Sequence, residues 1–145
     1  MVSTVFNEMS RLSSTIQDIE HQSLKPAQIV ITDAGSTDGT FEELQKWSQR
    51  SSIEILVLRK KKCNVAEGRN MAIRNASHDL IVSTDFGCRF HPDWLQSLVQ
   101  LFDDPVVKVV GGNFSVLATE LNSWAERAAY ICANGYRNRM DDTFL

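Results

Sequence analysis

Acidic side chains directly follow two apolar segments of this sequence. Asp33 comes after Gln28–Thr32, and Asp85 comes after Leu80–Thr84. Carboxylates at such positions accept hydrogen bonds from a ribose or a base, or hold a divalent cation through their oxygen atoms. The simpler alternative for Asp33 is that it organises a tight turn. Both interpretations stay open on the residues alone.

A glycine-containing turn and two basic stretches add further candidates. Gly35 and Gly39 permit a tight turn after Asp33, but no Gly-Lys-Ser/Thr or G-x-G-x-x-G pattern accompanies them. An ATP-binding P-loop and a dinucleotide fingerprint therefore lose support. The run Arg59–Lys62 fits either a solvated loop or attraction for a pyrophosphate. Arg69 fits either contact with a base or phosphate or a surface ion pair.

The histidines and cysteines lack the spacing of a metal site or a catalytic pair. The three histidines are scattered, and Cys88 has no paired histidine that would make it a nucleophile. The three cysteines are far apart, so neither a disulfide framework nor a zinc site is expected. A reducing compartment is the simpler interpretation.

Short apolar segments alternate with segments of helical period along the chain. Strands are expected at residues 2–6, 28–32, 53–58, 80–84 and 106–110, and helices at 9–19, 41–47, 66–76, 92–102 and 122–139. Thr40 and Glu43 have the spacing of a capping box. The alternation predicts an α/β fold, with a mostly parallel sheet between two layers of helices. Such sheets bind ligands at the carboxyl ends of their strands.

Length and composition narrow the class of protein. The 145 residues suit one domain, and 43% hydrophobic with 23% charged residues is a globular composition. A net charge of −3 gives no reason to expect nucleic-acid binding. No signal peptide is visible, and no apolar run approaches the roughly 18 residues of a membrane span. We expect a cytoplasmic protein, with the inner face of the membrane as the second option.

Four ordered segments resemble successive motifs of the family 2 glycosyltransferases. They span residues 2 to about 113, and they read Val2-Ser-Thr-Val-Phe-Asn-Glu8, Asp33-Ala-Gly-Ser-Thr-Asp-Gly-Thr40, Ala66-Glu-Gly-Arg-Asn-Met-Ala72 and Thr84-Asp-Phe-Gly-Cys-Arg-Phe-His-Pro-Asp-Trp-Leu95. The resemblance implies the GT-A fold, a Rossmann-like nucleotide-binding α/β sandwich. It also implies transfer of a sugar from a nucleotide-diphosphate sugar to an acceptor.

The resemblance assigns donor-binding roles to residues near the first two expected strands. Phe6 and Glu8 would line the base pocket. Asp33 would contact the nucleoside, and Gly35 and Ser36 of the following turn would belong to the same donor-binding set.

The resemblance also assigns roles to two residues later in the chain. Arg69 would lie near the base or the phosphates. Asp85 takes the first position of the D-x-D motif of the family, which holds the ribose and an Mg²⁺ or Mn²⁺ ion. A divalent ion allows a diphosphate to approach carboxylates, and it stabilises the departing diphosphate.

The sequence departs from the family pattern in three places. Ala34 replaces one base-contacting carboxylate, and Gly87 replaces the second carboxylate of the D-x-D motif, for which Asp93 is a speculative substitute. A site with one carboxylate should hold the metal more weakly. The chain ends at Leu145, whereas the acceptor-binding half and the catalytic base of the family come later. The pair Asp141–Asp142 is expected to be a loop feature, so the catalytic base stays unassigned.

These departures predict that residues 1–145 form a single, truncated nucleotide-sugar-binding domain without its acceptor-binding half. The expected activity is inverting transfer to an unknown acceptor, either a saccharide or a lipid-linked molecule. One alternative is a non-catalytic nucleotide-sugar-binding module or an inactive fragment. Another is an unrelated α/β domain, such as an oxidoreductase or a protein-interaction domain. Apolar surface exposed near residues 110–135 would promote a homo-oligomer.

Overall fold

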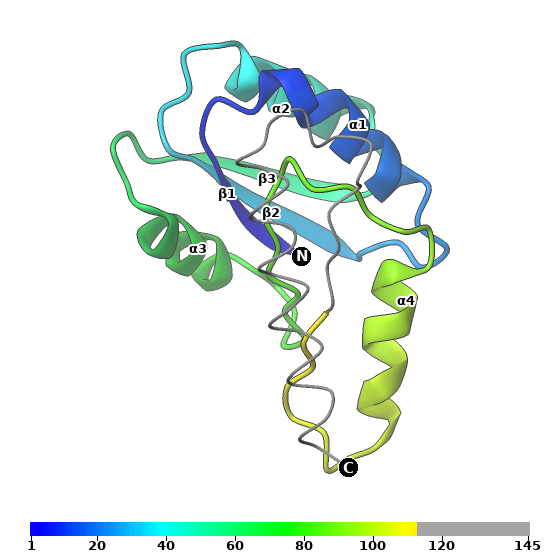
Figure 1. The fold of residues 1–145 in the computed structure, drawn as a ribbon. Helices are drawn as coiled ribbons and strands as arrows, with labels where there is room; N and C mark the ends of the chain where they lie inside the picture. The colour runs from blue at the N-terminus through cyan, green and yellow to red at the C-terminus, as the bar shows by residue number, and fades with distance from the viewer. Residues whose placement is uncertain (113–145) are drawn as a thin grey trace, which may run out of the picture. The chain divides into compact units, whose positions relative to one another are not determined.

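The computed structural model describes residues 1–112, and its ordered elements alternate between strands and helices. Residues Met1–Val110 form one compact unit, which contains all of these elements. Its elements, coloured along the chain in Figure 1, are β1 (Val2–Val5), α1 (Met9–Glu20), β2 (Gln28–Asp33), α2 (Thr40–Arg50), β3 (Glu54–Arg59), α3 (Val65–Arg74), α4 (Trp94–Val99) and a 3₁₀ turn (Gln100–Asp103).

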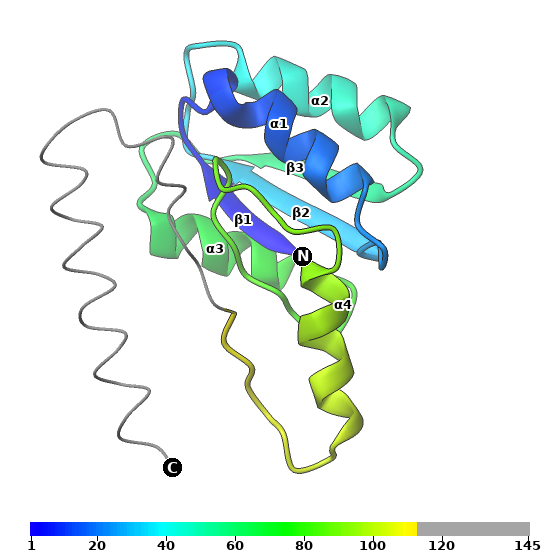
Figure 2. The same ribbon diagram turned by 45° about the vertical axis from the view of Figure 1, so that its right-hand side comes forward.

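The three strands form a parallel sheet in the order β1-β2-β3. Helices α1 and α2 cover one face and α3 covers the other, as Figure 2 shows. Because side chains alternate along a strand, each face has its own apolar cluster. The larger cluster includes Ile29 and Ile31 of β2 with Leu12 and Trp47 of the helices. The expectation of an α/β sandwich with a parallel sheet is therefore confirmed.

Helix α3 lies unusually close to β1 because residue 68 has no side chain. A Cβ atom at Gly68 would stand 2.4 Å from Cγ2 and 2.5 Å from Oγ1 of Thr4, which is too close for real atoms. The Thr4 hydroxyl also donates a hydrogen bond to the carbonyl of Val65, at 3.1 Å. Glycine at position 68 thus lets the first turn of α3 rest directly on the sheet.

The capping box predicted for Thr40 and Glu43 is wrong. Gly39 precedes α2 in the left-handed conformation, with φ of 97°, and no side chain caps this helix. The Asp38 carboxylate instead accepts hydrogen bonds from the backbone N–H and the hydroxyl of Thr40. A capping box does start α3, where Asn64 and Glu67 bond each other's backbone N–H groups.

Two of the five predicted strands do not form as expected. Residues 80–84 make a single parallel bridge, Ser83 to Val2, flanked by backbone hydrogen bonds of 2.8 and 3.3 Å. Residues 106–110 form no strand, and Val106 and Val109 are 80% and 87% exposed. An apolar run becomes a strand only beside a partner, and none accompanies these valines within residues 1–112.

Several expectations concern the remaining segments. The helix expected at 92–102 is split into α4 and the 3₁₀ turn. The helix expected at 122–139 and the pair Asp141–Asp142 lie outside the described residues, as does most of the apolar surface expected near 110–135. Within residues 1–112, every helix is too short or too polar to traverse a lipid bilayer.

Candidate functional site

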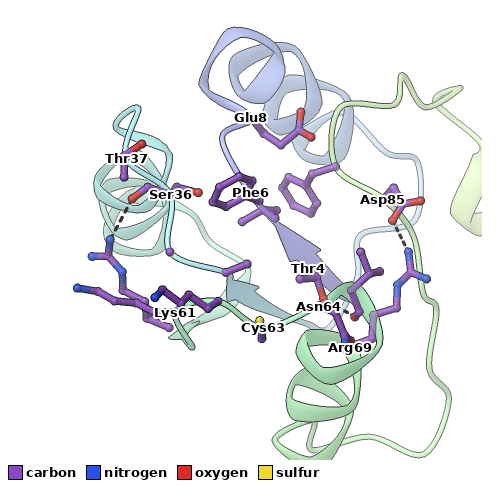
Figure 3. A pocket seen from close by; sticks show the side chains of 17 residues that line it. Thr4, Phe6, Glu8, Ser36, Thr37, Lys61, Cys63, Asn64, Arg69 and Asp85 are labelled. Carbon is purple, nitrogen blue, oxygen red and sulfur yellow. Dashed lines mark hydrogen bonds and ion pairs between the residues drawn. The ribbon is translucent and has the colours of Figure 1, made fainter.

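A cavity of about 1000 Å³ lies where the three strands end (Figure 3). Its walls come from the loops that follow β1, β2 and β3, from the start of α3, and from the segment after the Ser83 bridge. Six of the seven residues implied by the family resemblance line it: Phe6, Glu8, Gly35, Ser36, Arg69 and Asp85. The seventh, Asp33, is fully buried and is not among the lining residues.

The Asp33 carboxylate shapes the turn after β2. Its Oδ1 atom accepts hydrogen bonds from the backbone N–H groups of Gly35 and Ser36, at 3.0 and 3.1 Å. The same oxygen lies 3.3 Å from Nε of Arg59. The turn-organising alternative therefore describes what this side chain does in the structure, while direct contact with a nucleoside stays a prediction.

Hydrogen bonds tie the loop after β1 to the loop after β2. The backbone N–H of Asn7 donates to Oγ of Ser36, and Oδ1 of Asn7 accepts from the N–H of Thr37, each at 2.9 Å. The N–H of Glu8 donates to Oγ1 of Thr40, also at 2.9 Å. Phe6 directly precedes the tied residues, is 57% exposed and lines the cavity. An exposed aromatic ring there offers a flat apolar surface to a planar ligand.

The basic loop after β3 is fastened against the loop after β2. The N–H groups of Lys60 and Lys62 donate to the carbonyls of Asp33 and Ala34, both at 2.9 Å. Lys61 packs its carbon chain against Gly35, whose φ of 104° lies in the left-handed region. These backbone bonds direct part of the basic run toward the cavity, and the sequence did not reveal them.

The cavity has an excess of positive charge. Arg59, Lys61, Lys62 and Arg69 line it, against two carboxylates, Glu8 and Asp85. In a chain with a net charge of −3, this local excess favours an anionic ligand. Residues Arg59–Lys62 are exposed, as the solvated-loop alternative expects, and three of them also line the cavity, so attraction for a pyrophosphate stays a prediction.

Arg69 and Asp85 form an ion pair across one wall of the cavity. Asp85 is 65% exposed, and Nε of Arg69 is buried without a hydrogen-bond partner among the described residues. Figure 3 shows this pair on the side of the cavity opposite Lys61, with Phe6 between them. The pair leaves the exposed carboxylate of Asp85 available to a bound molecule, whereas Nε of Arg69 is enclosed by protein.

The segment that bears Asp85 rests on α1. Asp18 of that helix accepts hydrogen bonds from Nε and Nη2 of Arg89, at 2.6 and 2.9 Å, and from the N–H of Phe90, at 3.0 Å. The hydrogen bonds from Arg89 are the largest cause that lowers the pKa of Asp18. Phe86 is buried against Trp47, with ring centroids 6.4 Å apart. Asp85 itself therefore projects from an anchored segment.

The Glu8 carboxyl has an elevated pKa. Partial burial is the largest cause, and the nearby Asp38 and Asp85 carboxylates add to it, whereas Arg11 opposes it. Asp93, the substitute considered for the missing D-x-D carboxylate, precedes α4 and does not line the cavity. No cluster of three or more His, Cys, Asp or Glu residues suited to a metal occurs in residues 1–112.

The sequence resembles characterised sugar transferases. It is 29% identical over 115 residues to validoxylamine A glucosyltransferase of Streptomyces hygroscopicus subsp. jinggangensis, which covers 77% of this chain and 27% of that protein. It is 28% identical over 80 residues to cholesterol galactosyltransferase of Borreliella burgdorferi, which covers 55% of this chain and 22% of that protein. The chain thus spans about a quarter of the length of these relatives.

Solved structures share the fold. S. aureus TarS superposes with a TM-score of 0.61 at 16% identity, over 84% of this chain and 23% of that one. A shorter form of TarS in complex with UDP gives a TM-score of 0.58 at 17% identity, over 81% of this chain and 38% of that one. The sequence also matches Glycosyl transferase family 2 over residues 1–144. This chain therefore belongs to glycosyl transferase family 2 and has its GT-A fold.

Proposed function

We propose that this chain binds a nucleotide-diphosphate sugar in the cavity and donates the sugar to an acceptor. The observation that carries the proposal is the cationic cavity at the carboxyl ends of the strands, in a chain of this family. Parallel sheets bind ligands at this edge, and two phosphates need positive partners. The UDP complex of TarS, a protein of the same fold, supports a nucleotide as the ligand.

Different lining residues contact different parts of the nucleotide-diphosphate sugar. The exposed ring of Phe6 stacks on the base, beside the turn that Asp33 holds in shape. Lys61 and Lys62 approach the diphosphate from one side, and Arg69 approaches it from the other. Asp85 accepts hydrogen bonds from the ribose. Each role rests on the position of the side chain in the cavity wall.

The oxygen atoms that line the cavity also suit a divalent cation. Asp85 and Glu8 offer carboxylate oxygens, and a diphosphate supplies further oxygens, which is the ligand type that Mg²⁺ and Mn²⁺ accept. A bound cation supplies charge neutralisation of the diphosphate as it leaves. Arg69 contributes to the same neutralisation and keeps Asp85 oriented through the ion pair.

The reaction we propose is an inverting displacement at the anomeric carbon of the sugar. A general base deprotonates an acceptor hydroxyl, which attacks as the nucleotide diphosphate departs. None of the residues 1–112 is assigned as this base. The acceptor is a saccharide or a lipid-linked molecule, and the chain spans about a quarter of the length of its relatives.

Calorimetric titration of the 145-residue chain with UDP and with other nucleoside diphosphates tests the donor site. The double variant Lys61→Ala/Lys62→Ala should bind the diphosphate about tenfold more weakly or worse, because two charged partners are lost. Lys25→Ala/Lys46→Ala is the matched control, because it removes two exposed lysines that pair only with glutamates outside the cavity. Equal losses in both double variants would contradict the assignment.

Incubation with UDP-sugars and saccharide or lipid-linked acceptors tests the transfer step. Release of UDP that depends on the acceptor supports the enzyme. Tight donor binding with no transfer to any acceptor would favour the non-catalytic binding module instead.

A further inference from the structure

Gly87 occupies the second acidic position of the D-x-D motif, yet a carboxylate stands beside it. A Cβ atom built on Gly87 would lie 2.7 Å from Oε2 of Glu8 and 3.4 Å from its Cδ. The φ of 91° at Gly87 lies in the left-handed region, which favours glycine. The space that an aspartate side chain at position 87 would enter is therefore already filled by the carboxylate of Glu8.

Hydrogen bonds from both sides bring this carboxylate to Gly87. The backbone of Glu8 begins α1, donating to Thr40 and accepting from the N–H groups of Arg11 and Leu12. The N–H of Gly87 donates to Oγ1 of Thr15, one helical turn further along α1, at 3.3 Å. The approach of residues 8 and 87 is thus set by the helix and not by a flexible side chain alone.

The Glu8 carboxylate makes no direct polar contact within residues 1–112, although the charge of Arg11 stabilises it. It precedes α1 but does not cap the helix, and within residues 1–112 it accepts no hydrogen bond and joins no ion pair. It lines the same cavity as Asp85. Partial burial of this carboxylate has a cost that Arg11 offsets in part, and a positively charged ligand in the cavity would offset it further.

We propose that Glu8 replaces the missing D-x-D carboxylate, so that Glu8 and Asp85 together hold the divalent cation of the donor complex. This inference rests on the proposed function. Mg²⁺ is commonly held by one or two carboxylates together with phosphate oxygens and water, and these two side chains meet that requirement. Arg11, whose Cδ lies 3.5 Å from the same point beside Gly87, offers the competing structural explanation of a charge partner for Glu8.

Titration of the full chain with Mn²⁺, followed by the EPR signal of the free ion in the presence of UDP, separates these explanations. Glu8→Gln keeps the shape of the side chain and removes its charge. We expect it to weaken Mn²⁺ binding by about tenfold or more, as Asp85→Asn should, because carboxylate count tunes affinity. Asp93→Asn is the matched control and should leave Mn²⁺ binding unchanged, since Asp93 lies outside the cavity.

A second set of variants tests the same point by moving the carboxylate from position 8 to position 87. Glu8→Ala/Gly87→Asp removes the side chain that fills the space and places an aspartate there. This double variant should recover much of the Mn²⁺ affinity that Glu8→Ala alone loses, whereas Gly87→Asp with Glu8 present meets a carboxylate at 2.7 Å and should not gain affinity. Thermal melting of each variant checks that it is folded, and Glu8→Gln decides the question if the swap does not fold.

The outcomes separate this inference from the proposed function. Wild-type Mn²⁺ affinity in Glu8→Gln, with a loss in Asp85→Asn, overturns the role of Glu8 and leaves the donor site intact. UDP binding that is equally tight with Mn²⁺ and with EDTA would also overturn the role of Glu8 and leave the donor site intact. Absence of UDP binding under every condition overturns the proposed function and this inference with it.

Discussion

Two segments beside the cavity each contain an aspartate, and the two are built in different ways. In the loop after β2, Asp33 is buried. Its carboxylate accepts hydrogen bonds from the N–H groups of Gly35 and Ser36 and pairs with Arg59. In the segment after the Ser83 bridge, Asp85 is 65% exposed and pairs only with Arg69 among the described residues. Two aspartates that hold equivalent positions after apolar runs thus have different physical roles.

The difference separates stability from binding in this site. A buried carboxylate that accepts several hydrogen bonds holds the backbone in place. Its removal leaves the buried donors without an acceptor. An exposed carboxylate with one ion pair contributes little to folding and stays available to a ligand. Substitution of Asp33 should therefore destabilise the fold, and substitution of Asp85 should mainly change what the cavity binds.

Asp33→Ala is the largest expected disruption. It leaves two backbone N–H groups and Arg59 without their acceptor, so we expect the free energy of unfolding to fall by about 3 kcal/mol. Urea denaturation followed by circular dichroism measures this. A loss below about 1 kcal/mol would show that Asp33 does not hold the turn.

Asp18→Asn should have an intermediate effect, because it weakens the anchor of the second segment on α1. We expect a loss of about 1–2 kcal/mol at pH 7, from the hydrogen bonds to Arg89 and Phe90. The folded-state pKa of Asp18 lies below its ordinary value of 3.8, so the stabilisation by its charge is present above that value and is lost as pH falls through the folded pKa.

Thermal melting of the wild type and Asp18→Asn at several pH values measures this dependence. The gap between their melting temperatures should be full at pH 7 and should close below the ordinary pKa of 3.8. A gap that stays constant down to strongly acidic pH would mean that packing, and not the charge of Asp18, anchors the segment.

Asp85→Asn should have the smallest effect on stability. Because the ion pair with Arg69 is solvent-exposed, we expect the free energy of unfolding to change by no more than about 0.5 kcal/mol. The same urea titration used for Asp33→Ala measures it. A loss as large as that of Asp33→Ala would erase the distinction between the two loops.

Much of the fold could be predicted from period and residue type. The apolar runs before Phe6, Asp33 and Lys60 form the three strands; β2 is buried along its whole length, whereas the edge strand β3 is only partly buried. Residues 80–84 and 106–110 have similar composition but form one bridge and no strand, respectively. The composition of a segment indicates how well it suits a sheet. It does not indicate whether a neighbouring strand is present to pair with it.

The residues that line the cavity could be predicted where they belong to a family motif. The position of the basic loop could not be predicted. Phe6, Glu8, Arg69 and Asp85 line the cavity as the resemblance implied, although their contacts with a donor stay predictions. The direction of the basic loop was not predictable, because it depends on backbone hydrogen bonds to residues 33 and 34 that leave no mark on the lysines themselves.

The contact between Gly68 and Thr4 has a consequence for redesign of the cleft. Since Arg69 follows directly on the residue that touches the sheet, a methyl group added at position 68 would act as a wedge, lifting the guanidinium and its whole helix outward. The effect depends on Thr4 being kept, because the atoms that such a methyl group would meet all belong to the Thr4 side chain. The width of the cavity is thus adjustable from position 68, which does not itself line the cavity.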